Sequence, residues 1–173
     1  MKSKLPEIRD CLAEAFHTAD PGTAIEVPGL CPQAPTLRPA DVLTRAAHPT
    51  LTVAVEVGVR APHASNAGDD AAETMRQDKL AYYEVHLDDL DRQGISYQPF
   101  TVTAFGRRHP SATKMLRQAA AKVARQQGIV NAKGLERRWQ RQLAAEVWRR
   151  ASRMVRACLP KWEAHPDGED VDN

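Results

Sequence analysis

Apolar residues recur every three or four positions in four stretches of the chain, a spacing that places them on one face of a helix. The predicted helices cover residues 5–16, 69–92, 110–127 and 135–159. Asp20-Pro21-Gly22 stops the first, and Gly94 and Gly128 end the second and third. Their apolar stripes are Leu5, Ile8, Leu12, Ala15 and Phe16; Leu80, Tyr83, Leu87 and Leu90; Met115, Leu116, Ala119 and Val123; and Trp139, Leu143, Val147, Met154 and Leu159.

A second period, of two residues, predicts strands. In residues 50–59 the apolar positions alternate with Thr52, Ala54, Glu56 and Gly58, so we expect one face to be buried and the other to carry Glu56. Further strands are predicted over residues 23–27, 40–45 and 95–105. The proline-rich residues 31–39 and the polar residues 60–68 are predicted to be irregular.

The predicted order is helix, three strands, helix, strand, helix, with one more helix behind it, which indicates an α/β fold. We expect an αβββαβ core with a mixed sheet in residues 1–128, a basic helical extension in residues 129–162, and an acidic, disordered tail in residues 163–173. The chain of 173 residues shows no internal repeat and is long enough to bury a core of ordinary size.

Charge is distributed unevenly although the formal net charge is only +2. Residues 128–162 contain nine Lys or Arg and two acids, whereas residues 164–173 contain four acids and neither Lys nor Arg. A basic segment suits an anionic partner such as DNA, although a solvated helix face has the same composition. In the last predicted helix, Arg138, Arg141, Arg149, Arg153 and Arg156 do not share one stripe, which fits contact with a phosphate backbone without sequence readout.

Several classes of protein are excluded by composition. No apolar run reaches the 18 residues of a membrane span, and the N-terminus lacks the apolar segment of a secretory signal, so we expect a nuclear or cytoplasmic location and no membrane partner. Cys11, Cys31 and Cys158 are few and widely spaced, which predicts free thiols instead of a disulfide framework or a zinc cluster.

Two acidic residues and a lysine form the clearest candidate for chemistry. If the strands around Asp41 and Glu56 pair through a turn at Ala47-His48-Pro49, residues whose numbers sum to about 97 face each other. Asp41 then lies opposite Glu56, with Cβ atoms about 4.5–5.5 Å apart, where like charges repel and a divalent cation would relieve the repulsion. Lys79, on a helix that would pack over this hairpin, can reach the same point.

This set of side chains is suited to phosphodiester hydrolysis. Mg²⁺ is commonly held by one or two carboxylates, with the remaining positions left to water and phosphate oxygens, and it lowers the pKa of an attacking water. Asp41 and Glu56 are the predicted ligands for Mg²⁺ or Mn²⁺, and Lys79 is predicted to orient the water and offset the developing charge. Arg38, Arg60 and Tyr82 are predicted nucleic-acid contacts beside the site.

The motifs Arg38-Pro39-Ala40-Asp41, Glu56, Lys79-Leu80-Ala81-Tyr82 and the strand 97–106 ending in Phe105-Gly106 resemble the PD-(D/E)XK, or restriction-endonuclease-like, nucleases. Within that superfamily the likeness is greatest to the endonuclease domains of site-specific non-LTR retrotransposons. The resemblance covers about 120 residues and implies an αβββαβ core and a magnesium-dependent DNA endonuclease. It also implies an association with a reverse transcriptase or a larger mobile-element protein.

Alternative interpretations remain for the chain and for each residue. Gly58 stands where the family usually has its lysine, and Thr103 and Ala104 stand where an acid is common, so a catalytically inactive nuclease-fold module that binds nucleic acid or a protein is the second hypothesis. A structural α/β domain is the third. Asp41 alone reads as a turn or cap residue, Glu56 as a solvent-facing residue of an edge strand, and Lys79 and the arginines as surface residues. His86 and His109 are weaker candidates for acid–base chemistry, because neither has a partner nearby in sequence.

Overall fold

The structure is a computed structural model and describes residues 6–63, 65 and 68–158. Four helices and a four-stranded mixed sheet make an α/β fold, as the sequence predicts. In chain order the elements are α1 (Pro6–Ala19), β1 (Ala24–Ile25), β2 (Val42–Thr44), β3 (Thr52–Arg60), α2 (Ala71–Arg92), β4 (Ile95–Thr103), α3 (Pro110–Gln127) and α4 (Ala132–Cys158). The predicted tail, residues 163–173, lies outside the described part of the chain.

The sheet has the order β1-β2-β3-β4. β1 pairs with β2, and β2 with β3, in antiparallel fashion, whereas β3 and β4 are parallel and are joined by the α2 crossover. The β2–β3 register pairs Val42 with Val55, so the numbers of facing residues sum to 97, and this prediction is confirmed. β1 is shorter than the predicted strand 23–27, and β2 begins at Val42, one residue after Asp41.

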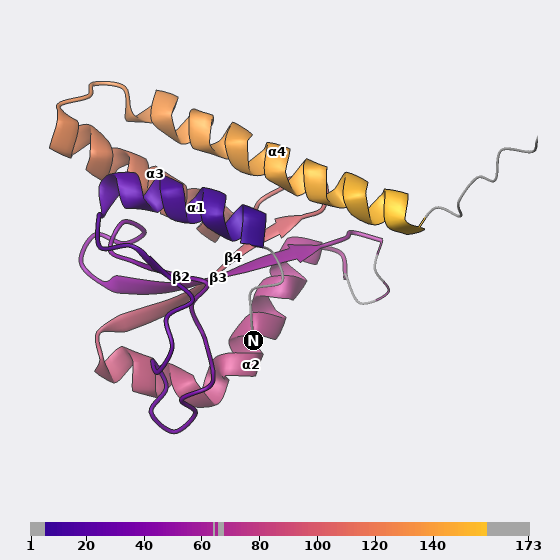
Figure 1. Cartoon of the computed structure of the whole chain (residues 1–173), viewed down its shortest axis with the longest axis horizontal. Helices are drawn as coiled ribbons and strands as arrows, with labels where there is room; N and C mark the ends of the chain where they lie inside the picture. The colour runs from indigo at the N-terminus through magenta and orange to yellow at the C-terminus, as the bar shows by residue number, and fades with distance from the viewer. Residues whose placement is uncertain (1–5, 64, 66–67, 159–173) are drawn as a thin grey trace, which may run out of the picture.

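Helices cover both faces of the sheet (Figure 1). α2 lies on one face against β3 and β4, α1 and α3 lie on the other, and α4 crosses α1 and α3 as an outer element. β3 is therefore a central strand. As expected, one of its faces is buried in the main core and the other carries Glu56; Ala54 and Gly58, on the side of Glu56, are also buried, beneath α2. The interpretation of Glu56 as an edge-strand residue is wrong because β3 is central.

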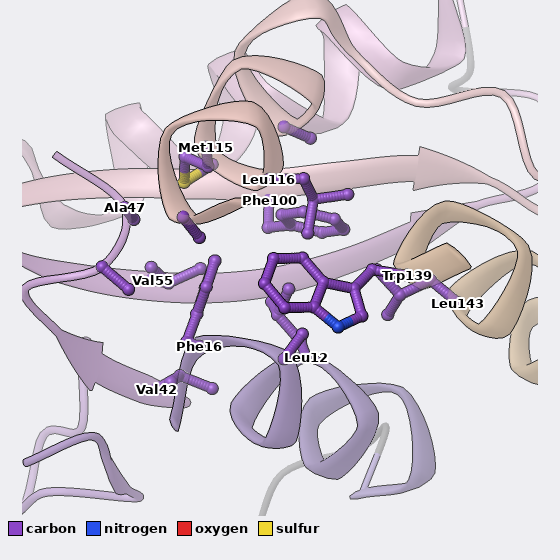
Figure 2. Close-up of a cluster of buried hydrophobic side chains, with 14 of the residues drawn as sticks. Leu12, Phe16, Val42, Ala47, Val55, Phe100, Met115, Leu116, Trp139 and Leu143 are labelled. Carbon is purple, nitrogen blue, oxygen red and sulfur yellow. The ribbon is translucent and has the colours of Figure 1, made fainter. Parts of the chain in front are cut away.

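The main hydrophobic core lies between the sheet and the layer of α1, α3 and α4 (Figure 2). Trp139 and Leu143 of α4 reach into it beside Leu12, Phe100 and Leu116, so α4 shares the core of the preceding segments. A second cluster beneath α2 includes side chains of the predicted α2 stripe; its buried members are Leu30, Cys31, Ala40, Ala54, Tyr83, Leu90, Ile95 and Tyr97.

The end of α4 departs from its predicted stripe. Met154 is 46% exposed, although Trp139, Leu143 and Val147 on the same stripe are buried as predicted. With 27 residues, α4 is about 40 Å long, whereas the 14 residues of α1 span about 21 Å. The C-terminal end of α4 thus extends past α1 (Figure 1). Leu159 lies outside the described residues.

Two further expectations can be compared with the structure. Cys11 and Cys31 are free thiols, as predicted, while the side chain of Cys158 lies outside what the structure describes. None of the described helices has the length and apolar character needed to cross a membrane.

Because α4 packs on the main core through only part of its apolar stripe, truncating two of its apolar residues should lower the free energy of unfolding by different amounts. Leu143→Ala is expected to lower the free energy of unfolding by about 2–5 kcal/mol, because it leaves a cavity in the main core. Met154→Ala should change it by less than about 0.5 kcal/mol, since that side chain is largely exposed. Urea unfolding followed by circular dichroism measures both; equal costs would show that α4 is not docked along this stripe.

Candidate functional site

Glu56 is held in the middle of β3 by two partners from different elements. Lys79 Nζ, on α2, lies 2.9 Å from Glu56 Oε1, and the Tyr97 hydroxyl, on β4, donates a hydrogen bond to Glu56 Oε2. The side chains of Lys79 and Glu56 are only 16% and 19% exposed. A carboxylate with so little exposure requires such compensation, because burying an unpaired charge is costly.

Asp41 approaches the same place from the edge of β2. Its Oδ2 accepts a hydrogen bond from the backbone N–H of Val57, with an N···O distance of 2.8 Å. Continued by one residue, the β2–β3 register places Asp41 opposite Glu56. Burial, and after it the negative charges of Glu56 and Asp41, raises the pKa values of Tyr83 and Tyr97. Asp41, Glu56 and Lys79 are thus brought together from three separate segments.

Gly58 leaves the space that the lysine side chain fills. A Cβ atom built on Gly58 would lie 2.6 Å from Lys79 Cε and 2.9 Å from Met75 Cγ, far closer than side chains approach one another. Any larger residue at position 58 would therefore displace Lys79 or Met75. The glycine and the lysine are sterically coupled, and the path by which Lys79 reaches Glu56 depends on the missing side chain.

Tyr97 and Tyr83 belong to the site although neither was a predicted site residue. Their rings are in contact with centroids 4.9 Å apart, and the Tyr83 hydroxyl donates to the carbonyl of Arg38 at 3.3 Å. Burial, followed by the charge of Glu56, raises the pKa of each hydroxyl above the ordinary tyrosine range. Both hydroxyls therefore remain neutral donors at physiological pH, which keeps the hydrogen bond from Tyr97 to Glu56 intact.

The first turn of α2 is anchored to the segment that follows β4. Asp70 caps the helix by accepting from the N–H groups of Ala72 and Glu73, and it pairs with Arg107. The hydrogen bond from Arg107, with those from the two backbone N–H groups, lowers the pKa of Asp70 to about 2. His109 Nε2 lies 2.7 Å from Glu73 Oε2, and its Nδ1 accepts from the N–H of Ser111 at the start of α3. These contacts fix the helix that carries Lys79.

His109 has an acidic partner in the structure, although none lies near it in sequence. That partner, Glu73, is distant in sequence and therefore could not be found from neighbouring residues. Its ring also acts as the N-cap of α3. His86 is half-buried on α2 and makes no ion pair within the described residues.

The predicted nucleic-acid contacts surround the site but are engaged elsewhere. Arg38 Nη1 lies 3.3 Å from Glu26 Oε2, and Arg60 pairs with Asp78 on α2. Tyr82 is 68% exposed and packs edge-on against Tyr83. Glu26 and Asp78 are polar residues that sequence analysis did not single out, since only the tertiary structure brings them to the arginines.

The chemistry of the two carboxylates fits a hard divalent cation. Within the described residues Asp41 has one hydrogen-bonded oxygen, Oδ2, and each oxygen of Glu56 has one donor, so further acceptor capacity remains. Mg²⁺ takes oxygen ligands and is often held by no more than two carboxylates. No group of three or more His, Cys, Asp or Glu residues suited to a metal occurs among the described residues. Any ion bound here would retain mostly water or substrate oxygens.

Comparisons of the chain with protein-family models, with curated proteins and with solved structures gave no match.

The burial of the Tyr97 hydroxyl beside the charge of Glu56 predicts that stability depends on alkaline pH. Because the folded-state pKa of Tyr97 is raised above the unfolded value of about 10, the folded protein binds more protons at high pH, and stability present below pH 10 is lost as the pH rises. Tyr97→Phe should flatten the fall in the free energy of unfolding between about pH 10 and 11, and Tyr83→Phe/Tyr97→Phe should flatten it further. Denaturant unfolding at several pH values measures the slope; slopes identical to that of the wild type would contradict this assignment.

Proposed function

We propose that the protein is a metal-dependent endonuclease domain of the retroelement type, hydrolysing DNA phosphodiester bonds at Asp41, Glu56 and Lys79. The observation that carries the proposal is the convergence of these residues from the edge of β2, from β3 and from α2. Two acids and an ammonium group collected at one partly buried point are what water attack on a phosphodiester requires. DNA is the proposed substrate, and Mg²⁺ or Mn²⁺ the proposed cofactor.

The order and register of the elements support a restriction-endonuclease-like core. α1, three strands, α2 and β4 follow one another in the αβββαβ order that the resemblance implies. Position 58, where the family usually has a lysine, is a glycine in this chain. A steric reason supports this difference, since Lys79 Cε fills the space that a side chain at position 58 would need. Lys79 thereby takes the place beside Glu56 from the helix instead of the strand.

Each residue has a separate part in the proposed reaction. Asp41 and Glu56 would hold the divalent ion, which when bound would supply a more acidic water and positive charge at the scissile phosphate. The Lys79 ammonium would orient the attacking water and stabilise charge that develops on the phosphate oxygens. Tyr97, by donating to Glu56 Oε2, would fix the direction of that carboxylate and act as a positioning residue.

Binding of DNA near this site would require the arginines to change partners. Arg38 and Arg60 would exchange the carboxylates of Glu26 and Asp78 for phosphate oxygens, which accept comparable charge-assisted hydrogen bonds. Tyr82 is exposed on the adjoining turn of α2 and is available to contact a sugar or phosphate. A nuclear or cytoplasmic location, and an association with a reverse transcriptase or a larger mobile-element protein, stay predictions of the sequence.

A second candidate, the catalytically inactive nuclease-fold module, is favoured by one feature of the same site. Lys79 already compensates the charge of Glu56, and both Glu56 oxygens have donors, so the fold does not need a cation to relieve repulsion between the acids. In addition, the position before Phe105 where the family often has an acid is occupied by Ala104, which is buried. Such a module would bind nucleic acid or a protein without cleaving.

Cleavage of supercoiled plasmid in Mg²⁺ or Mn²⁺ tests the proposal. The wild type is expected to nick or linearise the DNA, whereas Asp41→Asn and Glu56→Gln should lower the rate by at least about 100-fold, because each removes a charge that the reaction uses. Asp88→Asn, on the exposed side of α2, is a matched control that should cleave like the wild type. Melting temperatures of all variants separate loss of chemistry from loss of fold.

The outcomes of that assay distinguish the three hypotheses. Equal cleavage by the wild type and Asp41→Asn would remove the proposed site. DNA binding without cleavage in either metal would select the inactive module. A protein that binds no DNA at low salt would be the structural α/β domain.

A further inference from the structure

α4 and the proposed active site lie on opposite sides of the sheet (Figure 1). α2, which carries Lys79, has six acids and three Lys or Arg, whereas α4 has eight Lys or Arg and two acids. The strongest positive charge of the described molecule is therefore separated from the candidate site by the sheet and by α1 and α3. A strand of nucleic acid bound at the site would not explain why α4 is basic.

One side of α4 forms a groove with α3. The groove has a volume of about 430 Å³, and the residues that line it are Arg117, Ala121, Ala132, Lys133, Glu136, Arg137 and Gln140. Three of these side chains are cationic and one is acidic. Glu136 is itself buried, with Arg117 Nε at 3.7 Å and a hydrogen bond from Gln140, so it offsets only part of the positive charge around the groove.

The basic residues on this side of α4 have no acidic partners. Lys133, Arg137 and Arg141 form no ion pair with any residue in the described ranges, and Arg137 and Arg141 are exposed. Elsewhere on the same helix Arg149 pairs with Glu146 and Arg153 with Glu7 of α1, whereas Arg138 and Arg156 are exposed and form no ion pair within the described residues. What sets the groove side apart is that its unpaired cations lie beside a groove and on the same stripe as an exposed aromatic ring.

An exposed aromatic ring continues the same side of α4. Trp148 follows Arg137 by eleven residues and Arg141 by seven, spacings that return to the same stripe of a helix. Its side chain is 56% exposed, and its Nε1 would lie 3.4 Å from a Cβ built on Gly106. Between the groove and this ring, Arg108 donates to Gln140 of α4 and adds a further positive charge. From Lys133 to Trp148 the surface extends about 22 Å.

We infer that this surface, made of Arg117, Lys133, Arg137, Arg141 and Trp148, binds single-stranded nucleic acid. Lys133, Arg137 and Arg141, which have no ion pair within the described residues, would follow the phosphates of a strand together with Arg117, which pairs with Glu136. An exposed indole offers a face on which an unpaired base stacks, and this combination binds single strands without sequence preference. A duplex keeps its bases stacked and gains nothing from the ring. The inference goes beyond the proposed cleavage, because it concerns a different face of the molecule and requires no metal.

Binding to a fluorescent single-stranded oligothymidine in EDTA tests this inference. Arg137→Ala/Arg141→Ala is expected to raise the Kd by about tenfold at low salt and to reduce the slope of log K against log salt concentration by about 1.4, or about 0.7 for each lost phosphate contact. Arg149→Ala/Arg153→Ala removes the same net charge from the other side of α4 and should change the Kd by less than about twofold. Equal weakening by both double variants would show that bulk charge, not this surface, accounts for binding.

The aromatic part of the surface is tested separately. Trp148→Ala should raise the Kd for the single strand by about five- to tenfold, whereas Trp148→Phe should retain most of the affinity because it keeps a stacking face. Neither should alter binding to a duplex of the same length. Wild-type affinity of Trp148→Ala, or equal loss of affinity for single strand and duplex, would contradict the assignment of a single-stranded ligand.

Binding and cleavage measurements distinguish an error in the inferred single-strand binding from an error in the proposed endonuclease activity. Asp41→Asn should bind the oligothymidine like the wild type, since it leaves the α3–α4 side unchanged. Binding that depends on Arg137 and Arg141, in a protein that never cleaves DNA, would support this inference and refute the proposed catalysis. If the protein cleaves DNA but its Arg137→Ala/Arg141→Ala variant binds single strands normally, the proposed catalysis is supported and this inference is refuted.

Discussion

A carboxylate on the central strand of a sheet has to be compensated, and the arrangement of one whole side of this molecule follows from that constraint. Glu56 lies between β2 and β4 and under α2, with only 19% of its side chain exposed. Lys79 supplies the opposite charge and Tyr97 the hydrogen bond. Gly58 leaves room for the lysine, and the contacts of Asp70 and Glu73 with Arg107 and His109 fix the helix from which it comes. Losing one partner of such a pair costs about 3–5 kcal/mol when the pair is fully buried, so the site and the fold are not independent.

The two faces of the sheet differ in chemical character. The face under α1, α3 and α4 is filled by apolar side chains such as Phe16, Phe100 and Leu116 and provides most of the hydrophobic stabilisation (Figure 2). The face under α2 contains the polar network, with tyrosines where a purely apolar core would have aliphatic residues. α4 adds an outer basic surface that is remote from this network (Figure 1). A nuclease-like site on one side and a strand-binding surface on the other would let the domain hold nucleic acid independently of cleaving it.

Local features of the sequence predicted much of this structure, and long-range pairing accounts for what they missed. Pro110 and Gly128 bound α3 as expected, and the turn near His48 set the β2–β3 register that places Asp41 opposite Glu56. The register of the parallel pair β3–β4 cannot be read from the chain, because a 22-residue helix separates the strands, and Tyr97 was missed for that reason. Glu73, Glu26 and Asp78 were missed as partners of His109, Arg38 and Arg60 because those contacts are tertiary. Periodicity alone also extended the buried stripe of α4 to Met154, which is 46% exposed near the C-terminal end of the helix.

The proposed sharing of a divalent ion by Asp41 and Glu56 can be measured by calorimetric titration of the protein with Mn²⁺. The wild type is expected to bind about one ion per chain, and Asp41→Asn and Glu56→Gln should abolish this binding in variants whose melting temperatures show that they are folded. Asp88→Asn should bind like the wild type. Binding that persists unchanged in both site variants, or a wild type that binds no Mn²⁺, would show that Asp41 and Glu56 share no ion and leave the carboxylates with a structural role only.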